Sequence, residues 1–303
     1  MSQLRPLASV AGALLVLAGC GTSAPSTAPT PTAAAPATAA PVTAAPPTSA
    51  PLPTATPVPT NAYARNPTPY VEGAPYTVAI DPAAFVAGIS NPFLPFVQGA
   101  AFVFDGSEHV EVKVLPETKL ILGVPATVVQ DTVFEGGKVI EDTLDYYAQD
   151  VDGNVWYFGE KTAEYENGKV TSTAGTWEGG VNGAQPGIVM LAVPQVGDEY
   201  RQEYLAGEAE DLGAITAVSG SITVPTGTYS GNDVLVTEEW TPLEPDTRER
   251  KTYVRGLGVV ETRTIKGGSD VTTLTSMTTA SLTPPTALGA GFVLIVLRRR
   301  RRA

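Results

Sequence analysis

The sequence predicts an all-β fold, an antiparallel curled sheet that forms an open barrel or a sandwich. Residues 109–114 alternate polar and apolar side chains strictly, which is the two-residue period of a half-buried strand. Glycine-containing pairs at 136–137 and 167–168 separate β-branched segments and supply the positive φ angles that tight hairpins need. Because consecutive hairpins pair antiparallel strands, we expect one sheet that curls over its own apolar face.

The other expected strands are rich in β-branched and aromatic residues. They span 119–122, 126–134, 139–149, 199–205, 221–224, 233–240, 249–254, 259–265 and 271–277. Apart from a short helix at 82–86, no stretch of this region shows a helical period with caps. The turns after Tyr147 and Tyr253 resemble each other, which indicates either two related hairpins or turns that recur in any meander.

Composition divides the chain into four parts, which are 1–19, 20–68, 69–282 and 283–303. The segment 21–60 contains no charged or aromatic residue, so it cannot bury a core and is expected to be a disordered linker of extended, proline-rich backbone. The third part is the folded one, and its length is common among single all-β domains.

The folded part is strongly acidic. It contains 12 of the 19 Lys and Arg residues and all 31 Asp and Glu residues, which gives a net charge of −19. Such a charge repels phosphate backbones, so nucleic acid is excluded as an expected partner. Cations and neutral ligands remain compatible with it.

The N-terminus carries a lipidation signal. An apolar run at 7–18 follows Arg5, and its end forms the sequence Leu17 to Cys20 with the only cysteine of the chain. This sequence resembles the lipobox of bacterial lipoproteins. The resemblance implies a signal peptide cut before Cys20, a palmitate-type acyl group on that cysteine, and an extracytoplasmic protein held to the cell membrane by lipid. The alternatives are an ordinary secretory signal or a short membrane helix, but twelve helical residues reach about 18 Å of a bilayer core of roughly 30 Å.

Three stretches of the folded part are similar to the landmarks of a family of uncharacterised secreted bacterial proteins. They are Asn91-Pro92-Phe93-Leu94-Pro95 with Gly99, Asp150 with Gly153 to Glu160, and Gln202-Glu203-Tyr204 with Gly207, Ala209, Glu210 and Asp211. The resemblance covers residues 91–265 and implies a domain that occurs among exported proteins. It implies no activity and no catalytic residue.

The composition allows few catalytic sites. His109 is the only histidine and lies on the polar face of an expected strand, so Ser-His-Asp, Cys-His and zinc sites all lack residues. No phosphate-binding loop and no nucleophile-elbow motif occurs. We therefore expect no cofactor, no metal ligand and no catalytic residue of these classes.

The segment Asp150 to Asn154 begins like a calcium-binding EF-hand loop. The sixth and twelfth positions of such a loop require Gly and Glu, but here they hold Val155 and Lys161. A hairpin turn between strands at 146–149 and 155–158 is the favoured interpretation. Calcium binding is left open by the acidic surroundings.

Paired carboxylates are the one catalytic arrangement that the composition allows. The candidates are Glu141, Asp142, Asp145, Glu160, Glu203, Glu210 and Asp211. Four aromatic residues, Trp156, Tyr157, Trp177 and Trp240, are candidates for ligand binding, although such side chains also build sheet cores. Trp177 lies in the glycine-rich stretch 175–187, which is expected to be a loop that either covers a site or plugs the core.

The C-terminal part combines the apolar run 287–297 with Arg298 to Arg302, an arrangement similar to the tails that sorting enzymes process. It is too short to span a bilayer and lacks the sorting motif. The alternatives are an interfacial anchor held by anionic lipid and a damaged end of a once longer segment. The expected function is that of a membrane-anchored extracytoplasmic lipoprotein that binds a small molecule, lipid or glycan, or supports the cell envelope, without catalysis. The alternative is a carbohydrate-active hydrolase that uses paired carboxylates.

Overall fold

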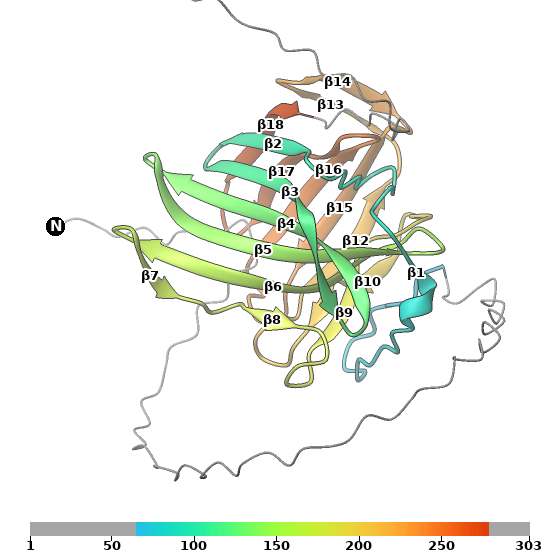
Figure 1. The fold of residues 1–303 in the computed structure, drawn as a ribbon. Coiled ribbons are helices and arrows are strands. Elements are labelled where there is room, and N and C mark those ends of the chain that lie inside the picture. The colour runs from blue at the N-terminus through green and yellow to red at the C-terminus, as the bar shows by residue number, and fades with distance from the viewer. Residues whose placement is uncertain (1–64, 279–303) are drawn as a thin grey trace, which may run out of the picture.

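The computed structural model describes residues 65–278, so Cys20 and the C-terminal part 283–303 lie outside the described residues. The described chain is nearly all β, and its main sheet is antiparallel throughout (Figure 1), which confirms the predicted fold class. Within the described range, no helix is long and apolar enough to cross a membrane.

Strands follow one another along the chain after a single 3₁₀ turn, η1. The elements are η1 Pro82–Ala84, β1 Phe85–Val86, β2 Ala101–Gly106, β3 His109–Ile121, β4 Val124–Glu135, β5 Lys138–Asp150, β6 Val155–Glu166, β7 Lys169–Ser172, β8 Trp177–Glu178, β9 Gln185–Met190, β10 Glu199–Arg201, β11 Glu203–Tyr204, β12 Leu212–Ala217, β13 Gly220–Val224, β14 Gly227–Gly231, β15 Val234–Trp240, β16 Arg248–Val254, β17 Gly258–Lys266 and β18 Val271–Thr278.

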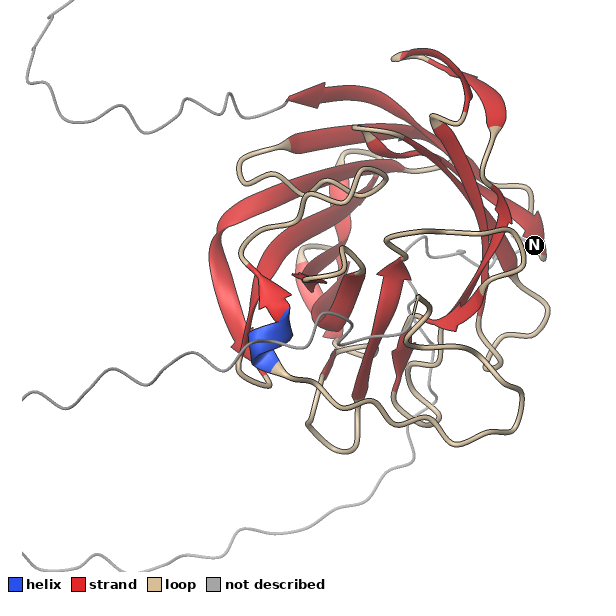
Figure 2. Ribbon diagram, turned by 90° about the vertical axis from the view of Figure 1, so that its right-hand side faces the viewer, coloured by secondary structure: helices blue, strands red, loops and turns tan. Residues whose placement is uncertain are grey.

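The main sheet runs in the order β10-β12-β15-β16-β17-β18-β2-β3-β4-β5-β6-β9-β11, while β1 pairs with β5, and β7 and β8 pair with β6. Strands β13 and β14 form a separate hairpin. Because only Gln202 separates β10 from β11, the two ends of this order meet on one continuous segment. The sheet therefore curls into a nearly closed barrel (Figure 2).

The seam of this barrel lies along residues 199–204. Strand β10 pairs with β12 along one edge of this segment. Along the opposite edge, only β11 pairs with β9. At β10 that edge pairs instead with the N-terminal strap, our name for residues 65–70. The backbone N–H of Arg201 donates to the carbonyl of Thr68 at 2.8 Å. The strap thus satisfies polar backbone groups that β9 leaves unpaired.

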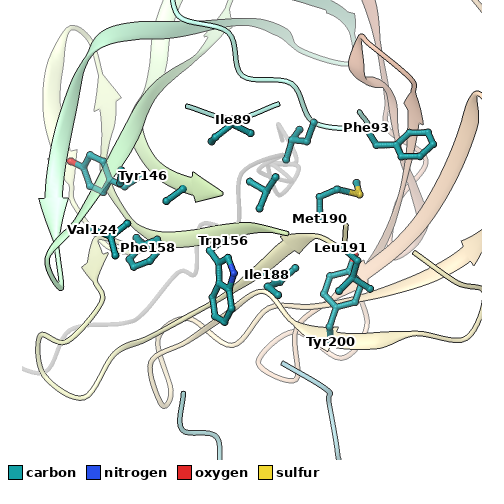
Figure 3. Close-up of a cluster of buried hydrophobic side chains, with 14 of the residues drawn as sticks. Ile89, Phe93, Val124, Tyr146, Trp156, Phe158, Ile188, Met190, Leu191 and Tyr200 are labelled. Carbon is teal, nitrogen blue, oxygen red and sulfur yellow. The ribbon is translucent and has the colours of Figure 1, made fainter. Parts of the chain in front are cut away.

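The largest buried side chains gather on β6, β9 and β10 (Figure 3). Trp156, Phe158, Ile188, Met190, Leu191 and Tyr200 are fully buried. Phe85 on β1 lies edge-on to Trp156 and Phe158, with ring centroids 6.0 and 5.3 Å apart. The chain before β2 therefore covers one face of β6 and completes this core.

Asn91 holds the segment 91–95 against the core. Its Nδ2 donates to the carbonyls of Gly153 at 2.9 Å and Leu191 at 3.3 Å, and its Oδ1 accepts from the N–H of Phe93 at 2.9 Å. These bonds turn the chain so that Phe93 and Leu94 enter the core cluster. The Asn-Pro-Phe-Leu-Pro sequence is thus a structural corner.

All the expected strands are present, and both resembling turns close hairpins, β5–β6 and β16–β17. The helix expected at 82–86 is only the 3₁₀ turn Pro82–Ala84, capped by the Asp81 side chain. The sequence does not predict β2, β9 and β12, three strands with a neighbour on each side in the main sheet. Strand β9 contains Pro186 and Gly187, residues that normally argue against a strand.

Candidate functional site

A cavity of about 230 Å³ lies inside the curl of the sheet. Its lining side chains come from strands all around the barrel, namely β2 to β6, β9, β11 and β15 to β18, and from residues 94, 96, 202, 211 and 257 outside the strands. One part of the lining is apolar and consists of Leu94, Phe96, Phe102, Phe104, Val110, Val112, Val129, Val189, Leu257 and Val259. Its three aromatic members, Phe96, Phe102 and Phe104, pack in one hydrophobic cluster.

The rest of the lining is acidic. Six carboxylic acids face the cavity, and Lys251 is the only basic residue among them. The acids are Asp131, Asp145, Glu160, Glu203, Asp211 and Glu239. Lys251 already forms an ion pair with Glu239, with Nζ and Oε2 separated by 2.6 Å. The other five have no ion-pair partner within 4 Å among residues 65–278.

A β-bulge places two polar side chains on the cavity. Tyr146 pairs with Gly159, but Tyr147 pairs with Tyr157, so Phe158 is the extra residue of β6. Because side chains alternate along a regular strand, positions three apart would face opposite sides. The bulge restores Tyr157 and Glu160 to the same side.

Tyr157 lies between two of the acids. Its hydroxyl oxygen is 2.6 Å from Asp145 Oδ1 and 2.9 Å from Glu160 Oε2. A phenol has one hydrogen to donate. The second contact is therefore a hydrogen bond only when the other carboxyl carries a proton and donates it to the phenol oxygen.

Burial favours the neutral form of these acids. Desolvation raises the pKa of Asp145 to about 7, against the hydrogen bond from Tyr157, and raises the pKa of Asp211 to about 6, against the attraction of Lys251. Burial raises the pKa of Glu160 and Glu203 well above the ordinary value, and neighbouring carboxylates add to the effect. The enclosure of these carboxyls therefore shifts each of them toward its protonated form.

Lys251 keeps its charge. Burial opposes the ammonium form, but the combined attraction of Glu239, Glu249 and Asp211 outweighs it and raises the pKa of the lysine. Glu239 also accepts from Thr237 Oγ1 at 3.0 Å. This pair is therefore satisfied within the protein.

Two polar groups on the cavity wall have no partner. The side chain of Gln202 is 7% exposed, lines the cavity and makes no side-chain hydrogen bond among the described residues. Asp131 Oδ1 is enclosed and equally lacks a hydrogen-bond partner there. A buried polar group without a partner costs about 1–3 kcal/mol. The Gln202 amide is available to a ligand in the cavity, whereas Asp131 Oδ1 is enclosed by protein atoms.

Only one of the four aromatic candidates lines the cavity. Tyr157 lines the cavity, and Trp177 packs edge-on behind it at 5.3 Å between ring centroids. Trp156 points to the other face of β6, where its Nε1 donates to Asp150 at 2.8 Å. Trp240 lies apart from the cavity, 6.3 Å from Tyr70 and beneath a guanidinium group.

The carboxylate candidates also divide into residues that line the cavity and residues that do not. Four of them line the cavity, namely Asp145, Glu160, Glu203 and Asp211. Asp142 accepts hydrogen bonds from Gln130 and Thr132, and Glu210 accepts from the N–H of Gly207. Glu141 is buried next to Thr143 and does not line the cavity.

Sequence reasoning did not find Asp131, Gln202, Glu239 and Lys251. The sequence does carry a signal for Asp131. Val129 and Val133 lie two positions before and after it on β4, so all three side chains face the same, buried side of the strand. For Lys251 no such signal exists, because residues 248–251 are all charged and both faces of β16 look alike.

The loop after β5 is built as a hairpin turn. Asp150 is fully buried, and its carboxylate accepts from the N–H groups of Asp152 and Asn154, from Asn154 Nδ2 and from Trp156 Nε1, at 2.8 to 3.0 Å. Protein donors thus surround both oxygens. In the part of the chain that the structure describes, no group of three or more His, Cys, Asp or Glu is arranged to hold a metal ion.

Comparisons with known proteins gave two similar structures. No family model matches the sequence, and no curated protein matches it. A Bacteroides fragilis protein of YmcC-like fold, described as exported, is 12% identical with a TM-score of 0.38, covering 63% of this chain and 100% of its own. A Parabacteroides distasonis protein described as a lipoprotein is 16% identical with a TM-score of 0.29, covering 62% of this chain and 99% of its own.

Proposed function

We propose that this protein is an extracytoplasmic lipoprotein, anchored to the membrane through Cys20, whose barrel binds a small amphiphilic molecule in its cavity without catalysis. The observation that carries the binding function is a cavity that combines an apolar wall with unsatisfied polar groups. Ligand sites are typically concave and mostly apolar, with a few polar groups that fix orientation. Gln202, which lines the cavity without a side-chain hydrogen bond among the described residues, is such a group here.

The size of the cavity limits the ligand. At about 230 Å³ it is smaller than the roughly 300–1,000 Å³ of sites that hold drug-sized molecules. A short alkyl chain or a pair of fused rings fits this volume. A sugar polymer does not.

The arrangement of the acids also favours binding over glycoside hydrolysis. Retaining glycosidases place two carboxyl groups about 5–5.5 Å apart with the sugar between them. In this cavity the space between Asp145 and Glu160 is occupied by the Tyr157 hydroxyl, which both carboxyls contact. These acids are therefore held by the protein and are not free to flank a substrate bond.

Fluorescence titration with 1-naphthylamine, a dye of two fused rings that is uncharged at neutral pH, tests the binding function. The full chain carrying Cys20→Ser is used, so that no acyl group requires detergent. We expect saturable enhancement with one site, lost on Val112→Trp, which fills the apolar wall, and retained on Val170→Trp, an exposed position of β7. Absence of binding to the unaltered cavity, or unchanged binding by a folded Val112→Trp protein, would overturn the proposal.

Metabolic labelling with palmitate tests the anchor. The wild-type chain should incorporate label and fractionate with membranes, because the lipobox resemblance implies an acyl group on Cys20. Cys20→Ser should lose both properties. Equal membrane fractionation of the two proteins would contradict lipid anchoring without bearing on the cavity.

A further inference from the structure

We propose that the ligand of the cavity is an organic cation, a primary amine on a short apolar chain. The proposal deepens the binding function above and rests on it. Its basis is the mismatch between acids and bases on the cavity wall, together with the apolar wall beside them.

The acids outnumber the bases six to one. Lys251 neutralises Glu239, with which it is in direct contact, and leaves Asp131, Asp145, Glu160, Glu203 and Asp211 without an ion-pair partner. An enclosed acid without a counter-charge is favoured in its neutral form. A cation that enters the cavity supplies the missing counter-charge, whereas an anion adds to the repulsion.

The geometry of an ammonium group suits this wall. It carries three hydrogen-bond donors and no acceptor. Glu203 on β11 is 5% exposed and lines the same cavity as Asp145 and Glu160. The negative charges of these two acids help to raise the pKa of Glu203. Charge-assisted hydrogen bonds to such carboxylates are stronger than neutral ones. The unpartnered amide oxygen of Gln202, next along the same segment, adds a further acceptor.

The apolar wall decides between an organic and an inorganic cation. Phe102 and Phe104 on β2 and Val112 on β3 line the same cavity as the acids. A hydrated metal ion makes no use of these side chains. An alkyl chain gains about fourfold in affinity for each methylene group that it buries against them.

Three probes of equal chain length test the charge preference. Isothermal titration calorimetry of the full chain carrying Cys20→Ser compares n-octylamine, 1-octanol and n-octanoate at about pH 8, where carboxylates are more fully ionised and an amine remains protonated. We expect octylamine to bind roughly tenfold more tightly than octanol or better, and octanoate more weakly than octanol.

Charge removal locates the ammonium. Glu203→Gln should weaken octylamine binding roughly fivefold or more and leave octanol within about twofold. Glu166→Gln, an exposed acid at the end of β6, is the matched control and should leave both affinities unchanged. If Glu203→Gln does not fold, Asp211→Asn takes its place with the same expectation.

The outcomes separate the two proposals. If the dye binds but octanol or octanoate has the same affinity as octylamine, the cation proposal is overturned and the binding function stands. The same holds if the dye binds and none of the three probes does. Octylamine binding that both acid variants leave unchanged also overturns it, since the amine then lies outside the acidic group. Failure of the dye and of all three probes overturns both.

Discussion

Tyr157 and Glu160 lie three positions apart on one strand, yet both face the cavity, with the phenol oxygen 2.9 Å from the carboxylate. A regular strand would send them to opposite faces. The bulge at Phe158 adds one residue to the strand, so that both side chains face the same side. Gly159, with its positive φ angle, makes the bulge possible. The facing of Tyr157 and Glu160 toward one wall of the cavity therefore depends on a single glycine.

Gly159→Ala should be strongly destabilising. The φ angle of Gly159 is +143°, and a Cβ there would lie 2.5 Å from the carbonyl oxygen of Trp177. We expect a loss of about 2–4 kcal/mol in the free energy of unfolding, measured by urea denaturation. Gly168→Ala is the control, since its φ is +75° with no atom within 4 Å, and it should cost about 1 kcal/mol. Equal losses at the two positions would show that contact with Trp177 does not constrain the bulge.

Stability should fall as the pH rises from about 4 to about 7. Burial raises the pKa of Asp145 from 3.8 to about 7, so the folded state binds a proton that the unfolded state has already lost in this range. The loss for this group is of the order of 4 kcal/mol, measured by denaturation at a series of pH values. The charged and titratable groups that interact with Asp145 are Tyr157, Glu141, Lys251, Asp131, Glu160, Glu203, Tyr146 and Tyr147.

Asp145→Asn isolates this effect. The variant removes the titrating group, so its stability should vary less with pH and exceed that of the wild type at about pH 8. Asp142→Asn lies on the same strand outside the cavity and should retain the wild-type slope. A wild-type protein whose stability increases between about pH 5 and 7 would contradict the buried state of these acids.

Arg201→Met should loosen the N-terminal strap. The guanidinium carbon of Arg201 lies 4.7 Å from the ring centroid of Tyr204, and within 5.6 Å of Tyr70 and Tyr76. Cation–π contacts of a buried arginine contribute about 2 kcal/mol. We expect roughly tenfold faster hydrogen exchange at the N–H of Tyr70, with β4 unchanged.

The control for the strap is Arg263→Met, which removes an exposed arginine paired with Glu261 on β17. It should leave exchange in the strap unaltered. Unchanged protection of Tyr70 in the Arg201→Met protein would assign the stability of the strap to its backbone hydrogen bonds alone.

Calcium should have no effect on the loop after β5. Because four protein donors already occupy the Asp150 carboxylate, adding calcium to about 1 mM or chelating it should move the Tm by less than about 1 °C. Asp150→Ala should cost about 3–5 kcal/mol through the donors that it leaves buried, and Asp152→Ala, which is exposed, should cost little. A clear rise of the Tm with calcium would contradict the structural role of Asp150.

The fold was predictable where alternation and turn chemistry agree. On β3, Val110 and Val112 face the cavity while His109 and Lys113 contact acids at the surface, as the period predicts. The pairing of β18 with β2 was not predictable, because it joins strands about 170 residues apart and no turn specifies it.

The candidate site was predictable only in part. The composition predicts Asp145, Glu160, Glu203 and Asp211 as candidates for paired carboxylates, but the sequence alone does not bring them to one wall. Polar residues are ordinarily assigned to the solvent face of a strand. A barrel with an acidic interior breaks that assignment, and in β16 the charged residues 248–251 conceal which face is inside.

The ion pair between Arg65 and Asp198 has a mechanical consequence. Arg65 Nη2 is 2.6 Å from Asp198 Oδ1, and its other amino group contacts Oδ2, at the start of the strap. Any tension transmitted along the chain from its N-terminal side reaches the barrel first at this clamp and at the few backbone bonds behind it. A pull would strip the strap away from β10 one bond at a time, and the hairpins that enclose the cavity would bear load only after that peeling is complete.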